Sequence, residues 1–452
     1  MRKPRFILFL VIIPLLITLS CDEKTDKIEI SIIGENTSTM QAMMSIEEDY
    51  ERENPNVDLK FHPNTFDDAF NKSNQDFANK TGLYDIVIQY NFSLSSFVEN
   101  DYIHLLDEVN SSVDSKMLAF ESDLFQNYWE ELGYYYNINS DSDKDVIKVG
   151  YPSAALTMLL MYNKSMFEDS INKEEYFSIY NKELKIPSNW EDYYTVAEFF
   201  TNEDKGEKGV CIEGGPGGFL YFELMNFLGG LKGGKVLDSK RGWDSKPDTN
   251  VIVNSPENLE ALKLYNKMKN FNSGQYSNVE QFEQMRIMKK GKTAMAFVWS
   301  DMIYPSLFAA ESDNRFGFAE VPGNSSILGG GAYFVNKQTK NLGEVSKFIN
   351  YLMQESTQVQ MALNGFCSPL KTTYLNPEVA KLPYSEALAK SLDRADIALV
   401  AGIDSNMINE IITTYIQRCW NDELTEEEAL EQIQSEITIG RKKLFSVNQK
   451  SN

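Results

Sequence analysis

The stretch IEISIIGENTSTMQAMMSIEEDYERENPNVDLKF, residues 28–61, decides the fold class. It opens with an apolar, strand-like run that stops at Gly34, and a polar loop rich in helix N-cap residues follows. Apolar residues then recur at helical spacing from Met40 to Tyr50, and Asn54-Pro55-Asn56 ends this helix. Residues 57–61 alternate as a second strand. Strand, helix, strand is the signature of a parallel strand pair with a covering helix.

The same alternation continues along most of the chain. A helix over about 67–79 leads into the apolar strand Tyr84-Asp85-Ile86-Val87-Ile88-Gln89. Residues from 341 onward are almost wholly helical, and further strands are expected at 146–152, 156–162, 208–212, 293–299 and 332–335. We therefore predict an α/β fold in which mostly parallel sheets are covered by helices.

The first 20 residues have the composition of an export signal. A basic start, Met1 to Arg5, precedes an uncharged, mostly apolar run over 6–19 that is too short to span a bilayer. A small residue directly before a cysteine, Ser20-Cys21, is what a lipoprotein signal peptidase cuts. We expect Cys21 to be lipid-modified and residues 21–27 to tether the protein to the extracytoplasmic side of a cell membrane, in the periplasm or at the cell surface. The alternative is a plain secretory signal with an incidental cysteine.

Composition excludes some classes of partner. Removal of residues 1–20 leaves 432 residues, too many for one hydrophobic core, and lowers the formal net charge from −23 to about −26. A surface this acidic repels nucleic acid and anionic lipid, so we expect no nucleic-acid partner. The simplest role of the charge is solubility.

Cysteines and histidines are too few for metal or triad chemistry. With Cys21 acylated, at most one disulfide can form among Cys211, Cys367 and Cys419, and the sequence does not decide whether it forms. No cysteine pair has the spacing of metal ligands, and the two histidines stand alone. We expect no metal, no cofactor and no enzymatic activity.

Six short segments resemble the family 1 extracellular solute-binding proteins of ABC importers, the group that contains the maltose-binding protein. They occur in the family's order along almost the whole mature chain. The segments are Tyr84-Asp85-Ile86-Val87, Leu105-Leu106-Asp107-Glu108, Val149-Gly150-Tyr151-Pro152 with Met161-Tyr162-Asn163-Lys164-Ser165-Met166-Phe167, Pro187-Ser188-Asn189-Trp190-Glu191-Asp192, Lys290-Gly291-Lys292-Thr293-Ala294-Met295, and the glycine-rich run Gly329 to Phe334.

The resemblance implies a monomeric, two-lobed fold of the type II periplasmic-binding-protein class, whose lobes close on a hinge over a solute. Breaks marked by glycine or proline near 150 and 328 indicate that the chain crosses between the lobes more than once. We assign residues 28–150 plus 278–327 to the first lobe and residues 151–277 plus 328–452 to the second.

Loops that follow the predicted strands supply the candidate ligand site, because ligands of open α/β sheets lie beyond the carboxyl ends of the strands. These loops combine aromatic faces with amide, hydroxyl and carboxylate groups, the mixture that a sugar ring needs. From the strand ends we expect Glu35, Asn36, Thr37, Gln89, Tyr90, Asn91, Trp299 and Asp301. From the second lobe we expect Tyr151, Gly217, Phe219, Tyr221 and Tyr333 to close over the solute.

The resemblance also bears on single residues. It implies that aromatic residues of the 214–221 region and Trp299 contact ligand, although one of Tyr221 and Phe222 is expected in the core. Maltose-type receptors carry a tryptophan into the sugar site from a late helix, and the corresponding residues 401–407 contain no aromatic. We expect Asp404, with Asn406 nearby, to supply polar contacts instead, which leaves a smaller or more polar solute open.

These observations predict a membrane-anchored receptor that captures a small solute, above all a mono- or oligosaccharide, and delivers it to the permease subunits of an ABC transporter. One alternative is an exported lipoprotein that senses or adheres without transport. The other is a secreted glycoside hydrolase, since 66 acidic residues could supply a pair of carboxylates, although no pair stands out in the sequence.

Overall fold

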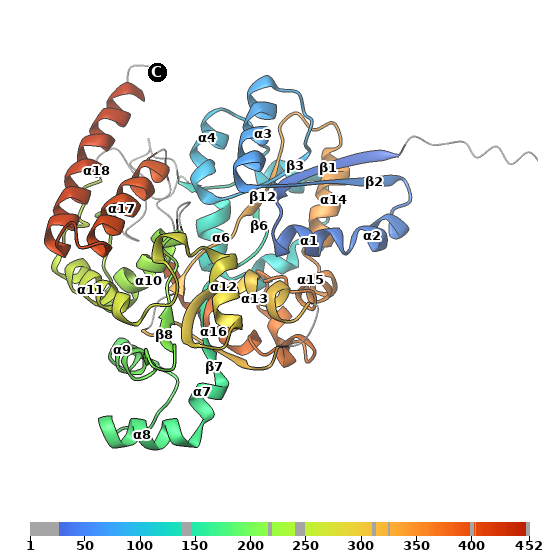
Figure 1. The fold of residues 1–452 in the computed structure, drawn as a ribbon. Helices are drawn as coiled ribbons and strands as arrows, with labels where there is room; N and C mark the ends of the chain where they lie inside the picture. Colours follow the sequence, from blue (N-terminus) through green and yellow to red (C-terminus); the bar gives the residue numbers. More distant parts are fainter. Residues whose placement is uncertain are drawn as a thin grey trace, which may run out of the picture.

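Two separate β-sheets divide the chain into two lobes (Figure 1). The computed structural model describes residues 27–136, 146–215, 219–239, 249–309, 313–323, 326–397, 402 and 404–448. The first sheet contains, in spatial order, β2 (Val57–Asn64), β1 (Ile28–Glu35), β3 (Ile86–Gln89), β12 (Ala332–Val335) and β6 (Tyr151–Pro152). The second contains β10 (Phe316–Ala319), β7 (Met158–Asn163), β9 (Thr293–Trp299) and β8 (Lys208–Cys211). Two short pairs join β4 (Tyr134–Tyr136) to β5 (Val146–Lys148) and β11 (Ser326–Ile327) to β13 (Ala395–Ile397).

Helices cover each sheet. Those of the first lobe are α1 (Ser38–Met44), α2 (Glu47–Glu53), α3 (Phe66–Asn79), α4 (Leu94–Glu99), α5 (Leu106–Val109), α6 (Gln126–Gly133), α14 (Leu342–Leu352) and α15 (Glu355–Ala362). Those of the second are α7 (Lys164–Glu168), α8 (Ser170–Tyr180), α9 (Trp190–Phe199), α10 (Phe219–Lys232), α11 (Pro256–Lys267), α12 (Gln281–Lys289), α13 (Ser300–Leu307), α16 (Ser385–Arg394), α17 (Ser405–Trp420) and α18 (Glu426–Asn448). In Figure 1, α1 to α4 surround the first sheet, whereas α7 to α9 lie below it and α10, α11, α17 and α18 lie to its left. None of these described helices is long and apolar enough to cross a bilayer.

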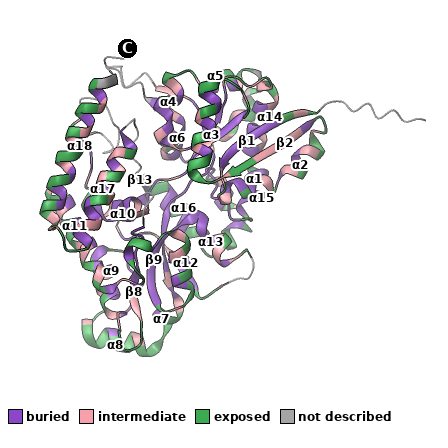
Figure 2. Ribbon diagram, turned by 45° about the horizontal axis from the view of Figure 1, so that its top comes forward, coloured by how far each residue is buried: buried purple, intermediate pink, exposed green. Residues whose placement is uncertain are grey.

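Local sequence signals place several of these elements as predicted. β1 and β2 run parallel, with Ile28 opposite Val57 and Glu35 opposite Asn64. Helix α11 begins at Pro256 behind Ser255, whose side chain accepts a hydrogen bond from the third residue of the helix. All seven residues of β9 are buried, which Figure 2 shows as a purple strand among helices with green outer faces. An apolar strand of this kind fits a position inside a sheet that is covered on both faces.

Both sheets are mixed, whereas the sequence predicted mostly parallel ones. In the first sheet β1 pairs in parallel with β2 and β3, but β12 is antiparallel to both β3 and β6. In the second sheet β8 and β9 are parallel, but β7 is antiparallel to β9 and β10. The antiparallel strands β7 and β12 are those that the chain forms directly after it has crossed from one lobe to the other.

The predicted lobe boundaries were wrong for two segments. β9, within residues 278–327, belongs to the second sheet, and β12, within residues 328–452, belongs to the first. The chain crosses into the second lobe after β6 and returns just before β12, so the breaks near 150 and 328 mark these two crossing segments, and no crossing occurs near 277. A further crossing, between α15 of the first lobe and α16 of the second, was not predicted. The strands that β9 and β12 pair with lie far away in sequence. For this reason the local sequence pattern did not reveal that β9 belongs to the second lobe and β12 to the first.

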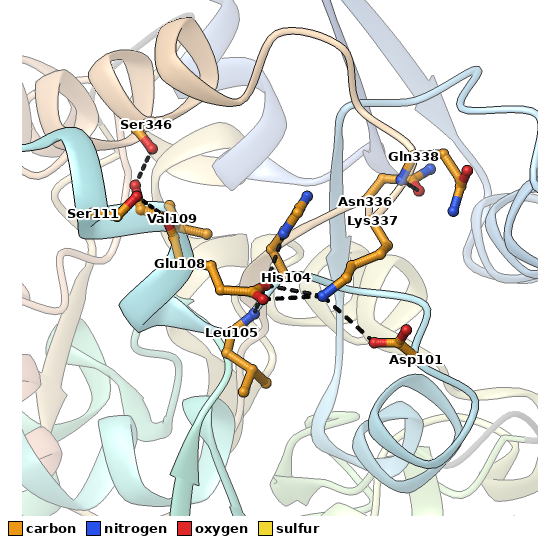
Figure 3. A network of polar contacts seen from close by, with 10 residues as sticks. All are labelled: Asp101, His104, Leu105, Glu108, Val109, Ser111, Asn336, Lys337, Gln338 and Ser346. Atoms are coloured by element: carbon orange, nitrogen blue, oxygen red, sulfur yellow. Dashed lines mark hydrogen bonds and ion pairs between the residues drawn. The ribbon is translucent and has the colours of Figure 1, made fainter.

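Asn336 fastens the returning chain to the first lobe. Its side-chain amide is fully buried and donates to the Asp76 carboxylate and to the Tyr84 carbonyl, both at 2.8 Å. Next to it Lys337 forms ion pairs with Asp101 and Glu108 (Figure 3). The segment that follows β12 is thus held by one buried network and one exposed network.

Asn336→Ala is expected to lower the free energy of unfolding by about 2–3 kcal/mol, because it removes the side-chain amide that donates to the buried Tyr84 carbonyl and one of the four donors to the buried Asp76 carboxylate. Asn341→Ala is the control, since the Asn341 amide donates to the Glu29 carbonyl at 3.0 Å in a more exposed position, and we expect a loss below about 1 kcal/mol there. Urea unfolding of both variants measures the difference. Equal losses would contradict the role assigned to the buried amide.

Candidate ligand-binding site

A cavity of about 830 Å³ lies between the two lobes. Residues from both lobes and from both crossing segments form its walls. They are Glu35, Thr37, Phe66, Asp67, Tyr90, Asn91, Phe92, Leu132, Leu156, Phe219, Phe222, Gln281, Trp299, Asp301, Leu328, Gly329, Gly330, Ser405, Asn406, Asn409, Glu410, Thr413, Thr414 and Gln417.

The strand-end loops meet at this cavity as predicted. Glu35 is the last residue of β1, and Thr37 is the N-cap of α1. Tyr90 and Asn91 directly follow β3. From the second lobe come Trp299 and Asp301, at the junction of β9 with α13, and Phe219 at the start of α10. Half of the predicted site residues therefore line one cavity.

Six other predicted residues do not line the cavity. Asn36 is exposed and accepts a hydrogen bond from the Gln41 side chain. Gln89 and Tyr221 are buried, as is Tyr333, whose hydroxyl donates to the Ser153 carbonyl. The Tyr151 hydroxyl donates to the Glu121 carboxylate inside the first lobe, and Asp404 forms a buried ion pair of 3.1 Å with Arg441. Gly217 lies outside the described residues.

The pair Tyr221 and Phe222 is divided between core and cleft. Phe222 lines the cavity and meets the Trp299 ring edge to face, with ring centroids 4.9 Å apart. The Trp299 ring in turn lies against Gly329, where an added Cβ would come within 2.6 Å of it. Gly329 is thus needed for close approach, because any side chain there would displace the indole.

Apart from Asn406, which was expected to supply a polar contact, the sequence analysis missed the wall that α17 provides. Its lining residues recur at helical spacing and are all polar: Ser405, Asn406, Asn409, Glu410, Thr413, Thr414 and Gln417. On the other side of the same helix Ile408, Ile412 and Ile416 are buried. This polar stripe was visible in the sequence, but nothing local showed that it faces a cleft instead of bulk solvent.

An aromatic cluster of the first lobe was also missed. Phe66, at the start of α3, lies 5.6 Å from the Tyr90 ring and 5.9 Å from the Phe92 ring between centroids. All three rings line the cavity. Aromatic faces therefore stand on both walls, opposite Phe222 and Trp299.

Two acidic residues line the cavity from different lobes, near the contact of α1 with α13. They are Glu35, at the end of β1, and Asp301, at the start of α13, and the charge of Glu35 acts on Asp301. Burial raises the pKa of Glu35, while the hydrogen bond donated by the Tyr90 hydroxyl lowers it by less. Burial, followed by the charge of Glu35, raises the pKa of Asp301 to about 6, although amides at the start of α13 donate to its carboxylate. Tyr90, Glu213 and Cys367 are the other titratable groups that feel the charge of Asp301.

Two further acids, Glu213 and Glu223, are buried in the second lobe. Both side chains are fully buried, and no described side chain donates a hydrogen bond to either carboxyl group. Burial raises the pKa of both groups well above the ordinary value. Burial therefore favours the protonated, uncharged form of both groups.

The described residues show no sign of a metal centre or disulfide. No three histidine, cysteine, aspartate or glutamate side chains among them gather as they do around a metal ion. Cys211, Cys367 and Cys419 are separate, buried thiols.

Solved structures share the fold. A solute-binding protein of an ABC transporter from Agrobacterium radiobacter K84, in complex with ribitol, matches with a TM-score of 0.72 at 20% identity, over 93% of this chain and 99% of its own. Maltose-bound MalE3 of T. maritima matches with a TM-score of 0.72 at 16% identity, over 91% and 99%. The GacH receptor of Streptomyces glaucescens GLA.O matches with a TM-score of 0.71 at 18% identity, over 90% and 97%. The predicted α/β fold of periplasmic binding proteins is thereby confirmed.

Residues 46–387 match the profile of the family described as bacterial extracellular solute-binding protein. The chain belongs to this family, since the match covers more than half of it. A search of curated protein sequences finds no match. Family membership identifies a receptor and not an enzyme, as the sequence predicted, and sets the glycoside hydrolase alternative aside.

Asp301→Asn is expected to stabilise the ligand-free protein at pH 7.5. Because the folded pKa of Asp301 is about 6 and its ordinary value is 3.8, the ionised carboxylate disfavours folding fully above pH 6 and not at all below about pH 3.8. Removing the charge should raise the free energy of unfolding by about 1–3 kcal/mol at pH 7.5, and the gain should vanish toward pH 4. Denaturant unfolding across this pH range measures it.

Asp313→Asn provides a control of opposite sign. The Arg315 guanidinium, 2.6 Å away, lowers the pKa of Asp313, so loss of this carboxylate should destabilise by about 0.5 kcal/mol. An Asp301→Asn protein that is less stable than wild type at pH 7.5 would contradict the cost assigned to the buried charge.

Proposed function

We propose that this protein is a membrane-anchored receptor that captures a mono- or oligosaccharide in the interlobe cleft and delivers it unchanged to an ABC permease. The observation that carries the proposal is the presence of aromatic faces on both walls. Tyr90 stands on the first lobe, and Phe222 and Trp299 stand on the second. The C–H face of a sugar ring stacks on such surfaces, which gives affinity without a charged ligand.

The polar groups of the cleft suit the hydroxyls of a sugar. Thr37 and Asn91 line the same cavity as the α17 stripe, whose hydroxyl and amide groups both donate and accept hydrogen bonds. The cavity volume of about 830 Å³ falls within the range of roughly 300–1,000 Å³ that is typical of small-molecule sites. Solutes from one sugar ring to a short oligosaccharide are therefore consistent with the site.

Structures with this fold hold polyhydroxylated ligands. Those described above were solved with ribitol, maltose or acarbose. Their low identity to this chain transfers no specific ligand, but their shared chemistry supports a sugar or polyol as the class of solute. The Agrobacterium protein is named as a solute-binding protein of an ABC transporter, which supports the permease as partner.

Closure of the lobes would couple binding to delivery. A ligand favours the closed form only by the difference between its affinities for the two forms. Here the cleft walls come from different lobes, so a solute contacts both fully only when the lobes are together. The permease would then recognise the closed arrangement of the two lobe surfaces.

Trp299→Ala should weaken sugar binding at least 30-fold, because it removes a stacking face and an indole N–H together. Trp299→Phe should retain part of the affinity while abolishing the ligand-induced change in tryptophan fluorescence. Phe177→Ala, at an exposed site on α8, is the control and should bind as wild type. Calorimetry against a sugar and polyol panel measures these affinities. Wild-type protein that binds no member of the panel would contradict the proposed function.

The membrane anchor is proposed from the sequence around Cys21. Cys21→Ser should move the protein from the membrane fraction to the soluble fraction and abolish metabolic labelling with palmitate. Ser20→Ala keeps a small residue before the cysteine and should leave labelling intact. Labelling that persists in Cys21→Ser would place the acyl group elsewhere.

A further inference from the structure

The charged groups on the cleft walls are all acidic. The described residues that line it include Glu35, Asp67, Asp301 and Glu410, and no lysine, arginine or histidine. Asp301 is 8% exposed and Glu35 is half-buried, whereas Asp67 and Glu410 are exposed to solvent. Hydrogen bonding to a neutral sugar does not require a wall of one sign.

We propose that the solute carries a protonated amine, and that this amine binds between Glu35 and Asp301. The solute would then be an aminated sugar. This inference rests on the proposed function, since it specifies the chemistry of the solute in the same cleft.

The two carboxylates are arranged to accept from a cation. Tyr90 donates to Glu35, and amides at the start of α13 donate to Asp301, so each carboxylate is held in place with acceptor capacity left over. They come from different lobes, and no described basic residue stands in the cavity wall beside them. An ammonium group between them would donate charge-assisted hydrogen bonds to both and offset their mutual repulsion. A neutral hydroxyl has a single O–H to donate and leaves both negative charges in place.

Trp299 distinguishes an aminated sugar from a simple polyamine. Trp299 is 6% exposed and lines the cavity. The C–H face of a sugar ring stacks on such an aromatic ring, whereas an open polyamine chain has no ring face to stack. The Tyr90 and Trp299 rings can also face the ammonium group, an arrangement that adds cation–π attraction.

Matched sugars that differ in one substituent test the inference. The disaccharides are β-1,4-linked glucosamine dimer, its N-acetylated form and cellobiose, which carry an ammonium, an amide and a hydroxyl at the same carbon. Amino and neutral monosaccharides of gluco, galacto and manno configuration, with putrescine and spermidine, complete the panel. Calorimetry at pH 7.5 should show at least one amino sugar binding about 30-fold tighter than its neutral partners, an advantage that shrinks in 0.5 M salt.

Variants assign the effect to the two carboxylates. Glu35→Gln and Asp301→Asn should each remove most of the preference for the amino sugar, measured as the ratio of the amino-sugar affinity to the neutral-sugar affinity of the same variant. Glu410→Gln is the matched control, because Glu410 lines the same cleft in an exposed position, and it should keep the preference. Thermal unfolding of each variant verifies the fold.

The possible results separate this inference from the function on which it rests. Neutral sugars that bind as tightly as their amino counterparts would overturn the inference and leave the sugar receptor standing. Polyamines that bind tighter than every amino sugar would overturn it in favour of a cation receptor. A panel without any sugar ligand would overturn both.

Discussion

The backbone pairing between the two crossing segments is the constraint on which the site depends. Leu156 donates to the Gly329 carbonyl at 3.0 Å and receives a hydrogen bond from the Gly329 amide at 2.9 Å. Ser153 donates to the Gly331 carbonyl at 2.8 Å. These bonds keep the outgoing and returning chains side by side, and the Trp299 ring rests on Gly329 directly beside them. A ring that lines the cleft is therefore packed on the segment about which the lobes would rotate.

Those parts of the site that follow from strand order could be predicted from the sequence. Each apolar strand ended at a recognisable polar loop, and ligand sites of α/β proteins lie beyond such ends, so Glu35, Tyr90 and Trp299 were found together. Tyr151 and Tyr333 were misplaced for a different reason. They face each other as neighbours across β6 and β12, within the first sheet, and both side chains are buried. Which face of a strand is buried depends on the sheet that it joins. The residues around a strand in the sequence do not reveal which other strands it pairs with.

The α17 wall shows the same limit for helices. Alternation of polar and apolar faces predicts that a helix is half-buried, and α17 is. Whether its polar face meets water or a cleft depends on elements more than a hundred residues away. Asp404, beside this face, was expected at the ligand but pairs with Arg441 of α18. A buried charge next to a site can serve the packing of two helices just as well as a ligand.

The position of the acidic pair bears on how the receptor distinguishes its empty and loaded states. Glu35 belongs to one lobe and Asp301 to the other, so their repulsion grows as the lobes approach and opposes closure of an empty cleft. A cation held between them would turn this opposition into attraction, so that closure depends on the occupant. Such a difference between states is what a delivery receptor needs, because a ligand that stabilised both forms equally would carry no signal to a permease. The buried negative charge lowers the stability of the ligand-free protein, but it would stabilise the form that holds a cation.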